Sequence, residues 1–525
     1  MNLHICVDAD YSRHKCWLKT DRIMFAGAVF IHDHLLSKQD ILSAFAEIRT
    51  TDGAIEFVKK LNGSFAIVLD LGGTIFLAVD RERTIPIFYK IEGDAVYVYN
   101  HISLETISSH GLNEQALAEL ENCLFVSGSK TLASNIYSVA AGETVVIADG
   151  NALRQYYFTF DHIKERYPDK QGLFQKIDEK FTEAIKRLIS YLDGRCAVVP
   201  LSGGHDSRLV VYYLKKLGYS NIVTYTYGPK GNVDAATSEK VAQYLELDWH
   251  CVEYEPKQLQ ELFKKKFREL VDYYSNGVSS VCIQDWYAVD YLHRKGIFPE
   301  NAVFVPGHSF DCIAGSFILP RYVQHDTVTR QELMGDILWK HYSEGKRRLS
   351  PARYAYYKSM IEESLLNGEP DVLPSDRAFN LYQNYNLRER QAKFICCQPK
   401  LYEYYGYDWY MPLWDSELID FWETIDIRSK YNRRLFFEFT QQKYGGLMKA
   451  APVENEKSKN EKKVNMNPVV RVIRKISQLT NYVDFHYCLA YFTRFDVYSM
   501  YLRNQVLNIG FFVNQKICKI VRRLK

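Results

Sequence analysis

The chain has 525 residues, 47% of them hydrophobic and 25% charged, so it is long enough for two folded cores and a tail. The formal net charge of +3 is small and argues against a nucleic-acid partner for the body of the chain. Its eleven cysteines show no CxxC spacing, and neither a signal peptide nor an apolar run of roughly 18 to 20 residues is visible, so we expect a cytoplasmic protein with reduced thiols.

The first part of the chain is rich in strand patterns, and we place a first domain at residues 1–160. Period-two alternation and turn signals separate its elements. Strands are expected at residues 24–31, 65–70 and 74–79, and amphipathic helices at residues 38–48 and 54–61.

A second domain is expected at residues 170–450, beginning with an amphipathic helix at residues 173–192. An apolar strand pattern at residues 196–201 and a helical pattern at residues 209–217 follow. Next come a strand at residues 221–227, a helix at residues 234–245 and a further strand. This βαβαβ order predicts a parallel sheet with a nucleotide at the carboxyl ends of its strands.

The sequence Ser-Gly-Gly-His-Asp-Ser lies between the first strand and helix of that unit. Gly203 and Gly204 let backbone N–H groups approach an anion, and Ser202 and Ser207 add hydroxyl donors. Asp206 would repel a phosphate unless a divalent cation lay between them. The loop therefore predicts a site for a magnesium-bound polyphosphate.

This loop resembles the SGGxDS pyrophosphate loop of the ATP pyrophosphatase superfamily, whose members split ATP into AMP and pyrophosphate while adenylating a carboxylate. The resemblance implies ATP and Mg²⁺ as cofactors. It also implies that the backbone of the second strand, at Tyr225, Thr226 and Tyr227, contacts the adenine.

A second motif, VFVPGHSFDCIAG, resembles the SGEGSDELFGG motif of asparagine synthetases. In this match Gly307 and Gly315 fall on glycines, and Asp311 falls on the aspartate that helps to hold magnesium and pyrophosphate. His308 replaces a glutamate that is a candidate base for the incoming amine, and Cys312 replaces another acid. His308 is either that base or a buried structural histidine.

A third match to the same family is YGYDWYMPLWDSELIDFW, in which Asp408 falls on a glutamate and Tyr410 replaces an arginine. We place Asp408 in the active site and expect Asp415 to cap a helix. Arg433 and Arg434 lie near the position of a family lysine and could meet phosphate, although exposed helix charges are the commoner explanation.

The first domain resembles the amidohydrolase-type amino-terminal domain of asparagine synthetases through LNGSFAIVLD and FLAVDRERTIPIFYK. In that family a cysteine directly after the initiator methionine hydrolyses glutamine, with its own α-amino group as the base. Asn2 occupies this position here, and Cys6 and Cys16 are internal. We expect no glutaminase activity, so the domain would be a structural relic or a docking platform.

The final segment, residues 465–525, carries ten Lys/Arg against only Asp484 and Asp496, together with many aromatic residues. Basic aromatic helices suit an anionic membrane face or a partner enzyme. Packing onto the second domain is the alternative that we favour. The sequence does not define the oligomeric state.

Together these features predict an α/β protein. An Ntn-hydrolase-like α+β sandwich would precede a parallel-sheet, adenine-nucleotide α-hydrolase-like (PP-loop) domain with helical additions. The resemblance implies an asparagine synthetase-like ligase, whose partners are a small-molecule carboxylate and an amine or ammonia. The alternatives are a β-lactam synthetase or peptide cyclase, which close an amide within one substrate, and a non-catalytic nucleotide-binding scaffold.

Overall fold

The computed structural model describes residues 2–7, 17–162, 169–228, 230–274, 276–343 and 349–451. Cys16 and the basic segment at residues 465–525 therefore lie outside the described residues, and the expectations for them stay predictions. Within the described residues, no helix is both long enough and apolar enough to cross a membrane.

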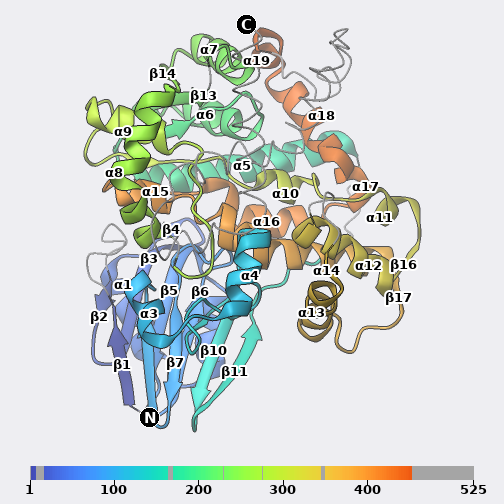
Figure 1. Ribbon diagram of the computed structural model, residues 1–525. Helices are drawn as coiled ribbons and strands as arrows, with labels where there is room; N and C mark the ends of the chain where they lie inside the picture. Colours follow the sequence, from blue (N-terminus) through green and yellow to red (C-terminus); the bar gives the residue numbers. More distant parts are fainter. Residues whose placement is uncertain are drawn as a thin grey trace, which may run out of the picture.

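The first domain is a sandwich of two sheets, and β1 begins at the end of the sandwich that is remote from the second domain (Figure 1). One sheet contains, in spatial order, β1 (Asn2–Cys6), β8 (Ala95–Tyr99), β7 (Phe88–Glu92) and β9 (Tyr137–Ser138). The other contains β11 (Asn151–Tyr156), β10 (Glu143–Ala148), β6 (Ile75–Val79), β5 (Asn62–Asp70), β3 (Ile23–Ile31) and β2 (Leu18–Lys19), with β4 (His34–Leu35) paired to β3. The paired strands are antiparallel, apart from the parallel pair of β1 and β8.

Alternation along the strands explains the two cores of this sandwich. Met24 and Val68 face the four-stranded sheet, whereas the adjacent Phe25 and Ile67 face the opposite side of the seven-stranded sheet, in a cluster shared with helix residues such as Phe45. Two helices cover that opposite side, α1 (Lys38–Glu47) and α2 (Thr51–Val58). The second helix begins earlier than the pattern at 54–61 predicts, because the Thr50 hydroxyl caps it by accepting from the Gly53 N–H at 3.1 Å.

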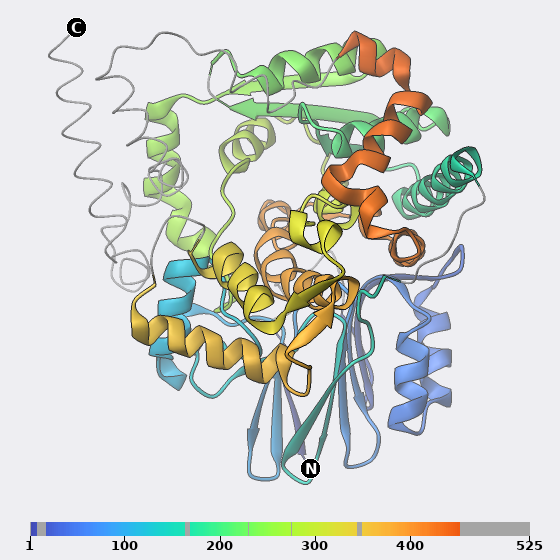
Figure 2. The same ribbon diagram turned by 90° about the vertical axis from the view of Figure 1, so that its right-hand side faces the viewer.

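The second domain is built on a five-stranded parallel sheet, which confirms the predicted fold class (Figure 2). In spatial order its strands are β14 (Asp248–Glu253), β13 (Ile222–Gly228), β12 (Ala197–Pro200), β15 (Val303–Phe304) and β18 (Asp408–Trp409). Helices α6 (Asp206–Lys216) and α7 (Val233–Leu245) belong to the βαβαβ unit, and α5 (Lys170–Leu192) precedes it. Because β12 and β15 are neighbours, the loops that follow them leave the same edge of the sheet side by side.

The remaining elements follow in chain order; the first two α-helices belong to the first domain and the others to the second. The α-helices are α3 (Leu104–His110), α4 (Glu114–Cys123), α8 (Pro256–Tyr274), α9 (Trp286–Arg294), α10 (Phe310–Ala314), α11 (Pro320–Gln324), α12 (Arg330–Ile337), α13 (Pro351–Ile361), α14 (Ser375–Asn386), α15 (Lys400–Tyr404), α16 (Ser416–Glu423), α17 (Ile427–Lys430), α18 (Arg434–Lys443) and α19 (Gly445–Ala450). There are also π-helices η2 (Leu338–Ser343), η3 (Glu362–Leu366) and η4 (Leu387–Ile395), 3₁₀-helices η5 (Pro412–Trp414) and η6 (Tyr431–Arg433), and a β16 (Thr327–Thr329) and β17 (Val372–Pro374) ribbon.

Polar contacts fasten the two domains together around α16. Asp415 caps this helix, as predicted, by accepting from the Leu418 N–H at 3.1 Å. The same carboxylate accepts two hydrogen bonds from Arg187, at 2.7 and 2.8 Å, and one from Asn62 of β5 at 2.9 Å. Each lone pair of a buried charge is thus matched to a donor, which offsets the cost of burying it.

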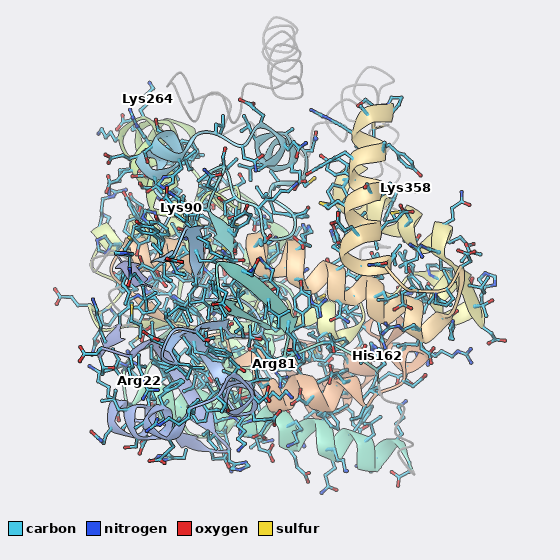
Figure 3. The ribbon with its side chains drawn as sticks, turned by 90° about the horizontal axis from the view of Figure 1, so that it is seen from below. Arg22, Arg81, Lys90, His162, Lys264 and Lys358 are labelled. Atoms are coloured by element: carbon cyan, nitrogen blue, oxygen red, sulfur yellow. The ribbon has the colours of Figure 1, made fainter. Side chains whose placement is uncertain are left out.

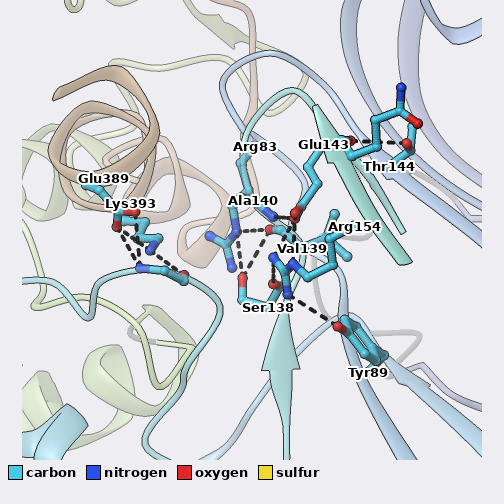
Figure 4. Close-up of polar contacts among 12 residues, drawn as sticks. Arg83, Tyr89, Ser138, Val139, Ala140, Glu143, Thr144, Arg154, Glu389 and Lys393 are labelled. Carbon is cyan, nitrogen blue, oxygen red and sulfur yellow. Dashed lines mark hydrogen bonds and ion pairs between the residues drawn. The ribbon is translucent and has the colours of Figure 1, made fainter. Parts of the chain in front are cut away.

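Two further contacts extend this interface. Arg81 of the first domain forms an ion pair with Asp420 of α16 (Figure 3). On η4, the Lys393 ammonium donates to the carbonyl oxygens of Val126 and Gly128, both at 2.7 Å, and to Glu389 at 2.6 Å (Figure 4). The second domain is therefore supported along its lower side by polar contacts with the first.

Candidate functional site

The loop between β12 and α6 folds its polar side chains onto its own backbone. The Ser202 N–H donates to Ser207 Oγ at 3.0 Å, and the two seryl oxygens lie 3.1 Å apart. The Gly204 N–H donates to Ser202 Oγ at 3.2 Å. These contacts bring the loop to the amino-terminal end of α6, where the helix dipole favours an anion.

Two glycines allow other segments to approach this loop closely. A Cβ added at Gly307, after β15, would lie 2.8 Å from the Ser207 nitrogen, and one at Gly203 would lie 2.7 Å from the Asp234 carboxylate on α7. Real Cβ atoms essentially never come that near to another heavy atom. The atoms beside Gly307 belong to the backbone, so this position requires glycine, whereas a side chain at Gly203 would displace the Asp234 carboxylate. The structure therefore brings the two sequence motifs into direct backbone contact.

Two carboxylates and one guanidinium make up the charges beside this contact. Burial raises the pKa of Asp206 to about 6, an effect that Arg433 opposes and the negative charge of Asp311 reinforces. Arg433 forms an ion pair with Asp206, and its side chain is only 13% exposed. The expectation that Arg433 is an exposed helix charge is therefore wrong, whereas Arg434 is exposed.

This arrangement fits a divalent cation. Among the described residues no group of three or more His, Cys, Asp and Glu side chains converges. Magnesium commonly binds through one or two carboxylates and the phosphates of its substrate. Asp206 and Asp311 supply such a pair, and the cation Arg433 already lies against one member of it.

His308 follows the glycine that contacts the phosphate loop. Its Nε2 atom is buried and has no hydrogen-bond partner within the described part of the chain. Burial lowers the pKa of this imidazole to about 4, so the ring is neutral at physiological pH. A neutral ring with an unoccupied nitrogen can accept or donate one proton, which is consistent with the predicted base.

The side chains of β13 belong mainly to the core. The Tyr225 hydroxyl donates to the buried Asp285 carboxylate at 3.0 Å, and Thr226 Oγ1 donates to the Leu201 carbonyl at 2.6 Å. Tyr227 is half-buried and stacks on the Tyr254 ring. The strand can therefore offer a ligand its backbone and the Tyr227 ring more readily than the other two side chains.

The structure does not bring Asp408 to this site, which corrects the expectation from the sequence. Asp408 opens β18 and is in register with Val303, which pairs with Ala197 at the start of β12. The phosphate loop follows the other end of β12. The Asp408 carboxylate instead accepts from Tyr191 at 2.6 Å and Arg195 at 2.9 Å, so it fastens α5 to the amino ends of the strands.

Sequence reasoning passed over Arg208, the residue that directly follows the loop. This buried side chain donates to the Gly203 carbonyl at 3.1 Å and to the Ala451 carbonyl at 2.6 Å, and so ties the loop to the end of α19. Burial lowers the pKa of the guanidinium to about 10. Only its place beside the SGGHDS motif could have marked it in advance.

A model of the asparagine synthase family matches residues 176–445, just over half of the 525-residue chain, and this segment contains both loops and Arg433. No curated protein matches the sequence. Among solved structures, an NH3-dependent NAD synthetase from Campylobacter jejuni is 14% identical over 41% of this chain and 96% of its own, with a TM-score of 0.22. A glutamine phosphoribosylpyrophosphate amidotransferase from B. subtilis is 11% identical over 47% of this chain and 74% of its own, with a TM-score of 0.20.

Proposed function

The chain belongs to the asparagine synthase family, and on that premise we propose that it is an AMP-forming, ATP-dependent carbon–nitrogen ligase. In the first step a substrate carboxylate attacks the α-phosphorus of ATP, and pyrophosphate leaves. In the second step an amine or ammonia attacks the acyl carbon, a C–N bond forms, the C–O bond to AMP breaks, and one proton is released.

The observation that carries this proposal is the contact between Gly307 and the backbone at Asp206 and Ser207. It joins an anion-binding loop to a second loop that bears an acid and a neutral histidine, at the carboxyl edge of a parallel sheet. A ligand held there would meet phosphate donors, carboxylates and a proton acceptor within one small region.

Different residues of the chain would hold the phosphates and the magnesium ion. The backbone and hydroxyl donors at Ser202, Gly204 and Ser207 would hold the β- and γ-phosphates. Asp206 and Asp311 would hold magnesium, which supplies the positive charge that offsets the phosphates.

Two further side chains have proposed roles. Arg433 would exchange its ion pair with Asp206 for one with a phosphate oxygen, because a bound cation would satisfy the carboxylate. His308 would accept the proton that the attacking nitrogen loses. The burial of the His308 ring suits this role, since the ring stays neutral before the reaction.

The test is to supply the purified full-length protein with ATP, magnesium and a panel of carboxylates and amines, and to identify the products by mass spectrometry and phosphorus NMR. AMP and pyrophosphate in equal amounts, with an amide product, are expected. ADP and phosphate as the products would contradict the proposal, as would nucleotide binding without turnover across the panel.

A further inference from the structure

A cluster of buried polar side chains lies between α10 and the continuous helix formed by α14 and η4. We call it the Cys312 cluster; it consists of Cys312, His341, Tyr382, Gln383 and Asn386. The side-chain amides of Gln383 and Asn386 donate to Cys312 Sγ at 3.2 and 3.1 Å. The His341 ring, from η2, lies 6.4 Å from the Tyr382 ring. All five side chains are at most 2% exposed.

This cluster leaves much of its hydrogen-bonding capacity unused. Within the described residues, no partner contacts Gln383 Oε1, Asn386 Oδ1, the Tyr382 hydroxyl or either ring nitrogen of His341. A buried polar atom without a partner destabilises the folded state. A helix that served only for packing would bury an apolar stripe instead, so the fold retains these groups at a considerable cost.

The free atoms define the chemistry of a fitting ligand. Two are amide oxygens, which only accept hydrogen bonds, and the phenol and imidazole can accept as well. A carboxylate has no N–H or O–H to offer them when ionised. A ligand with N–H groups satisfies these acceptors.

The charges nearby select the protonation state of such a ligand. Burial, with the positive charges of Arg390 and Lys340, lowers the pKa of His341 well below its ordinary value. The same two positive charges disfavour a bound ammonium ion and favour an uncharged amine. Only the uncharged amine has the lone pair that attacks an acyl-adenylate.

From these observations we propose that the Cys312 cluster binds the uncharged amine that supplies nitrogen to the reaction. This inference rests on the proposed function, because it assigns the second substrate of that reaction to a place in the fold. Cys312 lies on α10, which begins two residues after His308. The bound amine would form the C–N bond, and His308 would receive its surplus proton.

Binding of the amine can be measured separately from turnover. The probe is trifluoroethylamine, a weakly basic amine whose fluorine signal reports binding to the full-length protein by NMR. Trifluoroacetate, a carboxylate of similar size, is the matched control ligand. Gln383→Met and Asn386→Leu keep the side-chain volume and remove the acceptors. Arg377→Gln, at the exposed start of α14, is the control variant.

We expect saturable binding of the amine and none of the carboxylate. Each cluster variant should bind the amine about ten-fold more weakly through the loss of one hydrogen bond, whereas Arg377→Gln should not differ from the unaltered protein.

Preferential binding of trifluoroacetate, or unchanged amine binding in both cluster variants, would overturn the inference. The failure of the proposed function has a different signature. It would appear as an absence of AMP and pyrophosphate in the turnover experiment, whatever the fluorine probe does.

Discussion

One aspartate in each domain follows a strand, yet the surroundings of the two differ: Asp80 is fully buried after β6, whereas Asp206, whose side chain is 18% exposed, opens α6. Asp80 in the first domain accepts hydrogen bonds from the backbone N–H groups of Phe65, Glu82 and Thr84, and from the Thr84 hydroxyl at 2.6 Å. Asp206 in the second domain has one side-chain partner among the described residues, Arg433.

This difference separates a structural acid from a functional one. The donors around Asp80 come from its own turn and the neighbouring strand, so its carboxylate holds the hairpin in shape and has little capacity left for a ligand. Asp206 lies beside another acid, and its single partner is a long side chain that can move. A carboxylate with few hydrogen-bond donors around it can bind a cation.

The largest expected effect comes from removing the functional acid. Asp206→Asn should lower the rate of AMP formation by about 100- to 1,000-fold, because the neutral amide cannot offset magnesium and its bound phosphates. Asp311→Asn should behave alike. The measurement is AMP release from ATP under the conditions of the turnover experiment.

Asp178→Asn is the matched control for this substitution. The Asp178 side chain is 18% exposed, as is that of Asp206, and it also forms ion pairs, with Lys216 and Lys443. It lies on α5, away from the loop. AMP formation should fall with Asp206→Asn and persist with Asp178→Asn; equal losses in the two variants would mean that the effect is one of stability.

Removing the structural acid should have the opposite signature. Asp80→Ala leaves the N–H groups of Phe65, Glu82 and Thr84 without their acceptor, so the free energy of unfolding should fall by about 2 to 3 kcal/mol. The rate of AMP formation per folded molecule should stay near that of the unaltered protein. Thermal unfolding and single-turnover kinetics on the same sample distinguish the two. A stable variant without activity would place Asp80 among the functional acids and remove the contrast between the domains.

Arg433→Gln tests the ion-pair partner of Asp206 and should have a smaller effect. The loss of one charge-assisted contact to phosphate should raise the KM for ATP about ten-fold. Arg434→Gln, which changes the exposed neighbouring arginine, is the control. If Arg433→Gln lowers the KM, the guanidinium competes with magnesium for Asp206 and does not assist the phosphates.

The sequence predicts those parts of the site whose chemistry is local. The loop at residues 202–207 and the glycine at 307 need residue types that are visible in the sequence itself. The placement of Arg433 was not predictable, because it depends on two consecutive left-handed residues, Asn432 and Arg433, with φ of 55° and 59°. The prediction for Asp408 was wrong because its position depends on the register of the short strand β18, which no local pattern specifies. That register puts Asp408 at the end of the sheet away from the phosphate loop.

The Cys312 cluster was not visible in the sequence for a similar reason. Gln383 and Asn386 resemble the polar face of an ordinary surface helix, and only the packing of α14 against α10 shows that both are buried. Hydrophobic patterning predicts which face of a helix is apolar. Hydrophobic patterning does not predict which polar helix face the fold buries.

The smallest effect is expected in the first domain, at Cys6. This residue lies on β1, where partial burial raises the pKa of the thiol although a hydrogen bond with Tyr99 lowers it. A protonated thiol is a poor nucleophile. We therefore expect the protein to release no glutamate from glutamine, and Cys6→Ala and Cys16→Ala to leave both this baseline and ammonia-dependent amide formation unchanged. Glutamate release that either substitution removes would show that the first domain has its own chemistry, and its buried acids would then need to be reconsidered as parts of a second active site.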